Sequence, residues 1–178
     1  MMGRHHAPTP VMAKPLVAHD FSVDITDRQR LVRIGALWLE RLVRRALAAE
    51  GIERAEIGIL LVDDKRIAKV HDEWLGDPTP TDVITFDLSA AGPGGGAGSP
   101  LCGDIVVSTE TARRMSREFG WSPRQEVAYY VIHGLLHLTG YDDRVAADRR
   151  AMRARERTVM RAIGMPAPPR TRSRRSRS

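Results

Sequence analysis

The amino-acid sequence predicts an α/β fold of the α+β type, in which helices pack over a single mixed sheet of about four strands. Two observations support this fold. Short apolar segments of strand length interleave with longer segments that have helical spacing, which is typical of one sheet covered by helices. At 178 residues, the chain is also long enough for one domain with a proper core.

Four segments have the pattern of a strand. The first, Phe21 to Ile25, alternates apolar and polar residues, as a short half-buried strand does. The second, Ile57 to Val62, is a continuous apolar run, which is expected of a central strand covered on both faces. The other two segments are 81–88 and 102–107, and between them residues 90–100 form a Gly-rich connecting loop.

Five segments have the pattern of a helix, with approximate bounds 28–49, 64–74, 109–119, 123–139 and 145–163. The first four each follow a residue whose side chain accepts a hydrogen bond from the free N–H groups of the first turn. These predicted caps are Thr26 or Asp27, Asp63 or Asp64, Ser108, and Ser122. The last helix is dense in arginine on its exposed face.

The two ends of the chain differ in composition from the middle. We expect a folded domain over residues 16–164, between a disordered N-terminal lead (1–15) and a disordered Arg-rich tail (165–178). The last nine residues hold five arginines. Without them 23 basic residues face 22 acidic ones, so most of the net charge of +6 lies in the tail. Such tails commonly bind nucleic acid through its phosphates, and the alternative is a solubilising tail with no partner.

The remaining composition limits where the protein acts. A single cysteine, Cys102, excludes an internal disulfide framework and suits a reducing cytoplasm. No apolar run approaches the length of a membrane span, and the N-terminus lacks the apolar core of a signal peptide. We therefore expect a cytoplasmic protein with no membrane partner.

The strongest functional pattern is the run from His133 to Asp143, which reads His-Gly-Leu-Leu-His-Leu-Thr-Gly-Tyr-Asp-Asp. His133 and His137 are four residues apart, so on a central helix they lie on one face and both reach a single metal ion. Gly140 stops the helix, and the turn brings Asp142 and Asp143 back toward the histidines, where one carboxylate supplies a third ligand. Three protein ligands and one water are the pattern of catalytic zinc.

This run has two other interpretations. Histidines on an apolar helix are often core residues bonded to a carbonyl, but the Gly-Tyr-Asp-Asp turn favours a metal. A zinc protease carries Glu directly after the first His as its general base. Here that position is Gly134, which cannot transfer a proton, so the site is predicted to be hydrolytic but not proteolytic in the usual way.

The same run resembles the signature of the YbeY family of bacterial metal-dependent endoribonucleases, His-Gly-x-Leu-His-Leu-x-Gly-Tyr-Asp-His, at every fixed position but the last. Two further stretches resemble family motifs in the right order, Pro80 to Phe86 (Pro-Thr-Asp-Val-Ile-Thr-Phe) and Gly103 to Ser108 (Gly-Asp-Ile-Val-Val-Ser). The resemblance covers about Phe21 to Ile163, nearly the whole domain.

The resemblance implies a single-strand-specific endoribonuclease that acts in 16S rRNA maturation and ribosome quality control. It implies one Zn²⁺ per chain, held by His133, His137 and the residue at the last signature position, which is Asp143 here. It also implies a basic cleft for ribosomal RNA and the small ribosomal subunit as a partner, with the tail on RNA phosphates. His133, His137 and Asp142 are the candidate catalytic residues, although Asp142 and Asp143 could exchange roles.

Two departures from the family pattern favour a second hypothesis. Asp143 stands where the family has His, and a carboxylate makes the metal a weaker Lewis acid. Leu75 stands where the family usually has an Arg that acts on the RNA phosphate, unless Arg144 or another Arg substitutes. As a purely structural residue, Leu75 is expected to pack at a helix end. The alternative is therefore a ribosome-assembly factor that binds rRNA with a structural metal and cleaves little or nothing. A metalloprotease is a third hypothesis, against which Gly134 argues.

Overall fold

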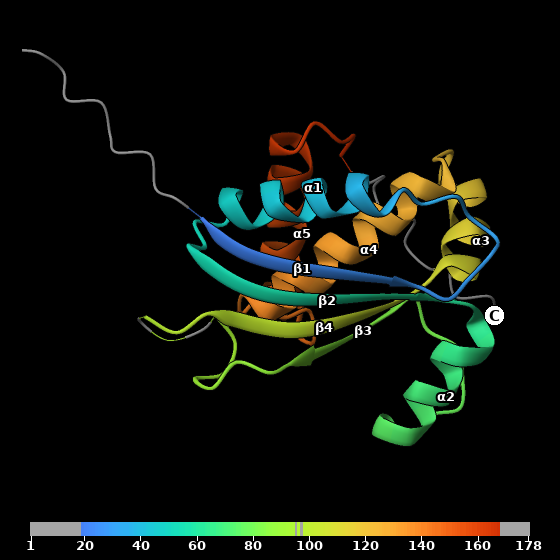
Figure 1. The fold of residues 1–178 in the computed structure, drawn as a ribbon. Coiled ribbons are helices and arrows are strands. Elements are labelled where there is room, and N and C mark those ends of the chain that lie inside the picture. The colour runs from blue at the N-terminus through green and yellow to red at the C-terminus, as the bar shows by residue number, and fades with distance from the viewer. Residues whose placement is uncertain (1–18, 95, 97, 168–178) are drawn as a thin grey trace, which may run out of the picture.

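The computed structural model describes residues 19–94, 96 and 98–167 of the chain. They form one four-stranded sheet in the order β1-β2-β4-β3 (Figure 1). Its strands are β1 (Asp20–Asp27), β2 (Arg54–Val62), β3 (Val83–Asp87) and β4 (Leu101–Ser108). β1, β2 and β4 run parallel and β3 pairs antiparallel with β4, so the predicted mixed sheet is confirmed. The predicted lead and nearly all of the predicted tail lie outside the described residues.

Five helices surround this sheet in the described part of the chain. They are α1 (Ala36–Ala49), α2 (Asp64–Leu75), α3 (Thr109–Phe119), α4 (Pro123–Leu138) and α5 (Ala146–Ala162). α1 and α4 lie over one face with α5 outside them, whereas α2 lies on the other side of the sheet (Figure 1). None of these helices is both long and apolar enough to cross a membrane.

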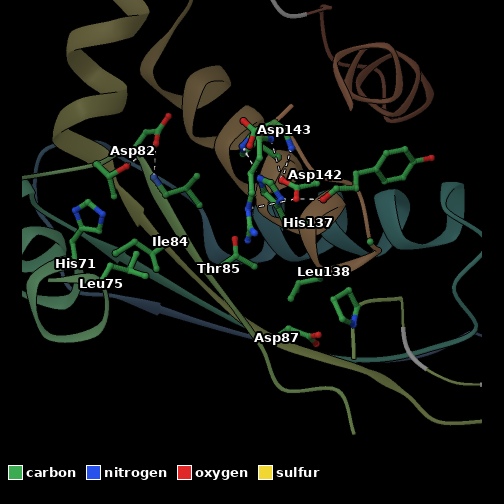
Figure 2. Close-up of a pocket in the computed structure, with 17 residues that line it drawn as sticks. His71, Leu75, Asp82, Ile84, Thr85, Asp87, His137, Leu138, Asp142 and Asp143 are labelled. Carbon is green, nitrogen blue, oxygen red and sulfur yellow. Dashed lines mark hydrogen bonds and ion pairs between the residues drawn. The ribbon is translucent and has the colours of Figure 1, made fainter. Parts of the chain in front are cut away.

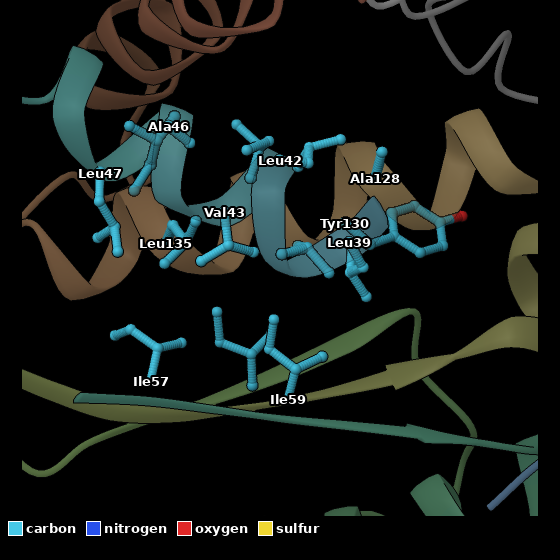
Figure 3. Packing of buried hydrophobic residues seen from close by; sticks show 14 of the residues in the cluster. Leu39, Leu42, Val43, Ala46, Leu47, Ile57, Ile59, Ala128, Tyr130 and Leu135 are labelled. Atoms are coloured by element: carbon cyan, nitrogen blue, oxygen red, sulfur yellow. The ribbon is translucent and has the colours of Figure 1, made fainter. Parts of the chain in front are cut away.

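The core lies between the sheet and the layer formed by α1 and α4. Ile57 and Ile59 of β2 point toward Leu39 and Val43 of α1 and toward Leu135 of α4 (Figure 3). All five side chains are almost completely buried. The opposite face of β2 is only partly covered, so the expectation of a strand buried on both faces holds for one face.

Most predicted helix boundaries are confirmed, because caps are local interactions. Asp63 and Ser108 accept hydrogen bonds from the first turns of α2 and α3. Ser122 and Gln125 form a capping box at the start of α4. α1 is the exception, because it begins at Ala36 and not near residue 28.

The late start of α1 has a local cause. The side chain of Gln29 accepts hydrogen bonds from the backbone N–H groups of Leu31 and Val32 and donates one to the carbonyl of Val32. Asp27 accepts a hydrogen bond from the backbone N–H of Gln29. These bonds fold residues 27–32 into a turn, since they use groups that a helix would need. The predicted cap at Thr26 or Asp27 is therefore wrong.

Gly134 allows α4 to lie close against the sheet. A Cβ atom at this position would come within 2.9 Å of Cγ2 of Ile105 on β4 and 3.0 Å of Oγ1 of Thr85 on β3. Side-chain atoms of the core do not approach this closely, so only glycine fits without movement. This close packing fixes the position of α4, which carries both histidines, relative to β3 and β4.

We expect Gly134→Ala to destabilise the protein by about 1–3 kcal/mol, because overpacking outweighs the helix propensity that alanine gains. Urea unfolding followed by circular dichroism measures this change. Gly35→Ala is the control, since its nearest contact would be an ordinary 3.8 Å. A Gly134→Ala protein as stable as the wild type would contradict the close-packing argument.

Candidate metal centre

A cleft of about 460 Å³ lies beside the C-terminal end of α4. α2, β3, α4 and the turn that follows α4 contribute its lining. Figure 2 shows His71 and Leu75 of α2 on one side and His137, Asp142 and Asp143 on the other, with Thr85 of β3 between them. The cleft therefore joins a helix on one face of the sheet to residues on the other face, around the β3 edge.

The two signature histidines meet in this cleft. Nε2 of His133 and Nε2 of His137 are 3.1 Å apart, and the ring planes are nearly perpendicular at 83°. A carboxylate oxygen of Asp143 lies with these nitrogens in one group, within which all ligand atoms are no more than 4.8 Å apart. The tertiary structure thus brings together the three residues that the sequence singled out as metal ligands.

The outer nitrogens of the two rings determine the protonation of the inner ones. Nδ1 of His133 lies 2.8 Å from Oε1 of Glu156, and Nδ1 of His137 lies 3.0 Å from the carbonyl oxygen of Tyr141. Both partners only accept hydrogen bonds, so each Nδ1 carries a proton. In the neutral rings, each Nε2 is therefore free to act as a ligand. Without a cation, the 3.1 Å contact between the two Nε2 atoms is a hydrogen bond, which His133 donates when its ring is protonated.

This donor set fits zinc. Two nitrogens bound at 2.0–2.1 Å to one tetrahedral ion lie about 3.4 Å apart, close to the separation of the two Nε2 atoms. Two imidazoles and one carboxylate are also an established combination for zinc with an open fourth position.

Glu156 is a site residue that the sequence analysis missed. It lies on α5, its side chain is 3 % exposed, and its second oxygen accepts a hydrogen bond of 3.1 Å from the hydroxyl of Tyr129. A carboxylate on the outer nitrogen fixes the orientation of a metal-binding imidazole and raises its basicity. A signal was present, because Glu156 interrupts the apolar stripe of Met152, Val159 and Met160 along α5.

The two histidines have opposite pKa shifts. Burial alone would lower the pKa of His133, but the hydrogen-bonded Glu156 carboxylate, together with Asp82 and Asp143, raises it above its ordinary value. Burial and the neighbouring His133 lower the pKa of His137. His137 is therefore the ring more readily available as a neutral ligand.

Asp142 mainly holds the turn after α4 in place. One of its oxygens accepts the backbone N–H groups of Asp143 at 2.7 Å and Arg144 at 3.1 Å, and the other lies 3.5 Å from Nε of Arg144. The hydrogen bond from the backbone of Arg144 is the main cause that lowers the pKa of Asp142. A carboxylate of lowered pKa is a weak proton acceptor, so this geometry favours an orienting role over that of a general base.

The side of the cleft formed by α2 carries little positive charge. Leu75 is 66 % exposed there, so it is not the packed residue that the sequence also allowed. His71, one turn earlier on α2, binds the carbonyl oxygen of Thr79 through Nδ1 at 2.8 Å. Arg144 is the only arginine or lysine among the described residues that line the cleft.

A second buried carboxyl, Glu126, lies in the first turn of α4. Its side chain is almost completely buried, and one oxygen has no hydrogen-bond partner among the described residues. Burial raises its pKa to about 7, and nearby Asp82 adds to the rise while a hydrogen bond from Tyr130 opposes it. Near neutral pH, much of this carboxyl is therefore protonated.

The fold and the site together define a class: an α+β domain that presents a His-x-x-x-His helix and a nearby carboxylate at a sheet-edge cleft. The family described as endoribonuclease YbeY matches residues 24–164. That range covers nearly all of the described domain, from within β1 to just after α5. The chain belongs to this family, as its three motifs predicted.

Individual relatives support the same assignment. The chain is 39% identical over 133 residues to the endoribonuclease YbeY of Moorella thermoacetica, covering 71% of this chain and 85% of that protein. It is 45% identical to the one from Anaeromyxobacter dehalogenans, covering 74% and 67%, and 33% identical to the one from Bacillus licheniformis, covering 80% and 95%. The solution structure of TM1509 from Thermotoga maritima shares the fold, with a TM-score of 0.57 and 24% identity over 79% of this chain and 88% of that one.

Glu126 predicts a pH dependence of stability. Its pKa is near 4.5 when unfolded and about 7 when folded, so the folded state binds the proton more tightly. The protonated Glu126 therefore contributes fully to the free energy of unfolding below about pH 4.5. This contribution, on the order of 3 kcal/mol, is lost as the pH rises through 7. Glu126→Gln should remove this decline in urea unfolding measured from pH 5 to 8. Glu118→Gln, on the exposed surface of α3, is the control, and identical pH profiles for both variants would contradict the assignment.

Proposed function

We propose that this chain is a zinc-dependent endoribonuclease that cuts single-stranded regions of 16S rRNA during maturation and ribosome quality control. The observation that carries the proposal is the pair of Nε2 atoms 3.1 Å apart, with a carboxylate beside them, in an open cleft of an endoribonuclease YbeY family fold. The relatives are endoribonucleases by name, which supports RNA as the substrate. The ribosomal RNA, the small ribosomal subunit and a cytoplasmic location remain parts of the proposal.

In this proposal His133 and His137 bind the ion through Nε2, and Asp143 binds it through a carboxylate oxygen. A divalent ion held there would polarise a phosphodiester and ease deprotonation of water. Glu156 and the carbonyl of Tyr141 keep the two rings in the tautomer that ligation requires. Asp142 fixes the turn that carries Asp143, and Arg144 lies where it could contact an RNA phosphate.

A carboxylate as third ligand weakens the Lewis acidity of the centre compared with a third imidazole, because it adds a negative charge. The exposed Leu75 leaves the α2 side of the cleft without a guanidinium that would stabilise charge on the phosphate. These two observations favour a second candidate, an assembly factor that binds rRNA with a structural metal and cleaves slowly or not at all. The measurements below separate the two candidates.

Metal content tests the ligand set directly. Elemental analysis of purified protein should give about one zinc per chain for the wild type and for Asp143→His, and much less for Asp143→Ala. Asp87→Ala is the matched control, since Asp87 lines the same cleft outside the ligand group and should keep its metal. Full retention of zinc by Asp143→Ala would exclude Asp143 as a ligand.

Cleavage of single-stranded rRNA fragments by the same proteins then tests the activity. Wild type should cleave, Asp143→Ala should not, and Asp143→His should cleave faster because its metal centre is more positive. A wild type that is loaded with zinc and binds RNA but does not cleave it would favour the assembly factor.

Glu156→Gln tests the orienting carboxylate. Glutamine can still accept the hydrogen bond from His133, but the charge is lost, so zinc affinity should fall by roughly 10–100-fold. Titration against a competing chelator measures the affinity. Glu50→Gln is the control, because it removes a similarly buried carboxylate that pairs with Arg155 of the same helix, away from the histidines. Equal affinity in all three proteins would show that Glu156 does not support the metal.

A further inference from the structure

The exposed side of α5 carries a row of arginines. Arg149, Arg153, Arg157 and Arg161 follow one another at four-residue steps, which places them along one side of the helix, and Arg150 lies beside them. All five are exposed. At 1.5 Å per residue the row from first to last spans about 18 Å.

These arginines have no acidic partners among the residues that the structure describes. None takes part in the ion pairs formed within the described ranges, although Arg155, on the other flank of α5, pairs with Glu50 of α1. The acids of α5 are Asp148 and Glu156, and Glu156 is buried against His133. Like charges at four-residue steps repel one another, so this row weakens the helix until something neutralises it.

The arrangement fits the backbone of a polyanion. Guanidinium groups bind phosphates with directed pairs of hydrogen bonds, and a row of them contacts consecutive phosphates without reading sequence. An anionic membrane surface fits poorly, because a helix that lies on a membrane needs a free apolar face. The apolar face of α5 is already buried, as Met152, Val159 and Met160 show.

α5 contacts the candidate metal centre through Glu156, and the arginine row begins close to the centre in sequence. α5 starts three residues after Asp143, and Arg149 stands in its first turns, just beyond Arg144 of the cleft. Figure 1 shows α5 crossing the outside of the layer that contains α4. Because Arg144 is the cleft's only arginine or lysine among the described residues, most phosphate contacts have to lie outside the cleft.

We propose that the arginine row of α5 binds the phosphate backbone of the single-stranded RNA that leads out of the cleft. This inference rests on the proposed function for the direction of the strand, but the binding itself is tested separately. The row supplies affinity and not sequence specificity, so its contribution should depend strongly on salt.

The test compares two triple variants that remove the same charge. One is Arg149→Gln/Arg153→Gln/Arg157→Gln, and the control is Arg41→Gln/Arg113→Gln/Arg117→Gln on exposed positions of α1 and α3. Binding of an uncleavable 2′-O-methyl single-stranded RNA is measured by fluorescence anisotropy over a range of salt concentrations. Three lost phosphate contacts should reduce the slope of log affinity against log salt by about 2 for the α5 variant and leave the control near wild type.

Thermal unfolding supplies a second readout. The α5 variant should be at least as stable as the wild type without RNA, since it removes repulsion between like charges. Equal slope changes in both triples would mean that only net charge matters, and no change in the α5 variant would mean that the row does not touch RNA. Either result overturns the inference.

The outcomes remain separable from those of the proposed function. If the salt slope falls only in the α5 variant and the wild type does not cleave RNA, RNA binding by the arginine row stands and the enzyme hypothesis is rejected. If the wild type cleaves RNA and the α5 variant has the same slope of log affinity against log salt as the wild type, the enzyme hypothesis stands and RNA binding by the arginine row is rejected. Stronger retention of the wild type on anionic lipid vesicles than on RNA would reject RNA as the occupant.

Discussion

Two hydrogen bonds at the outer edges of His133 and His137 govern the chemistry of the cleft. Each engages Nδ1 with an acceptor, so the Nδ1 protons stay on the outside and, in the neutral rings, both Nε2 atoms remain available as ligands. Without these bonds the rings could rotate or exchange tautomers, and a pair of histidines would be an ordinary polar contact. The fixed pair is what turns one helix face into a candidate cation site.

The fold holds this pair from three sides. The sheet supports α4 from below, and Gly134 allows the close approach. α5 packs on α4 and delivers Glu156, whose second oxygen is held by Tyr129. The turn after α4, which Asp142 holds in place, supplies the third side through the carbonyl of Tyr141. Buried carboxylates are costly unless they are paired, so the satisfied Glu156 and the half-satisfied Glu126 have different consequences. The first orders the site, whereas the second makes stability depend on pH.

Positive charge is distributed unusually around the cleft. The wall formed by α2 presents the apolar Leu75, and Arg144 stands on the opposite side. The larger concentration of unpaired arginine in the described residues follows on the outside of α5. If RNA binds as proposed, its affinity depends more on the surface beside the site than on the site itself. Affinity and catalysis are consequently assigned to different residues, which separate variants can test.

The sequence by itself determined the caps of α2, α3 and α4, the strand periodicities and the His133–Asp143 run, because each of these depends on residues only a few positions apart. It did not determine where α1 begins, since the turn around Gln29 competes with helix for the same backbone groups. Nor did it identify Glu156, which reaches His133 across 23 positions of sequence. Only the packing of α5 on α4 decides that contact, because a pattern along the chain says which face is buried but not which buried residues meet.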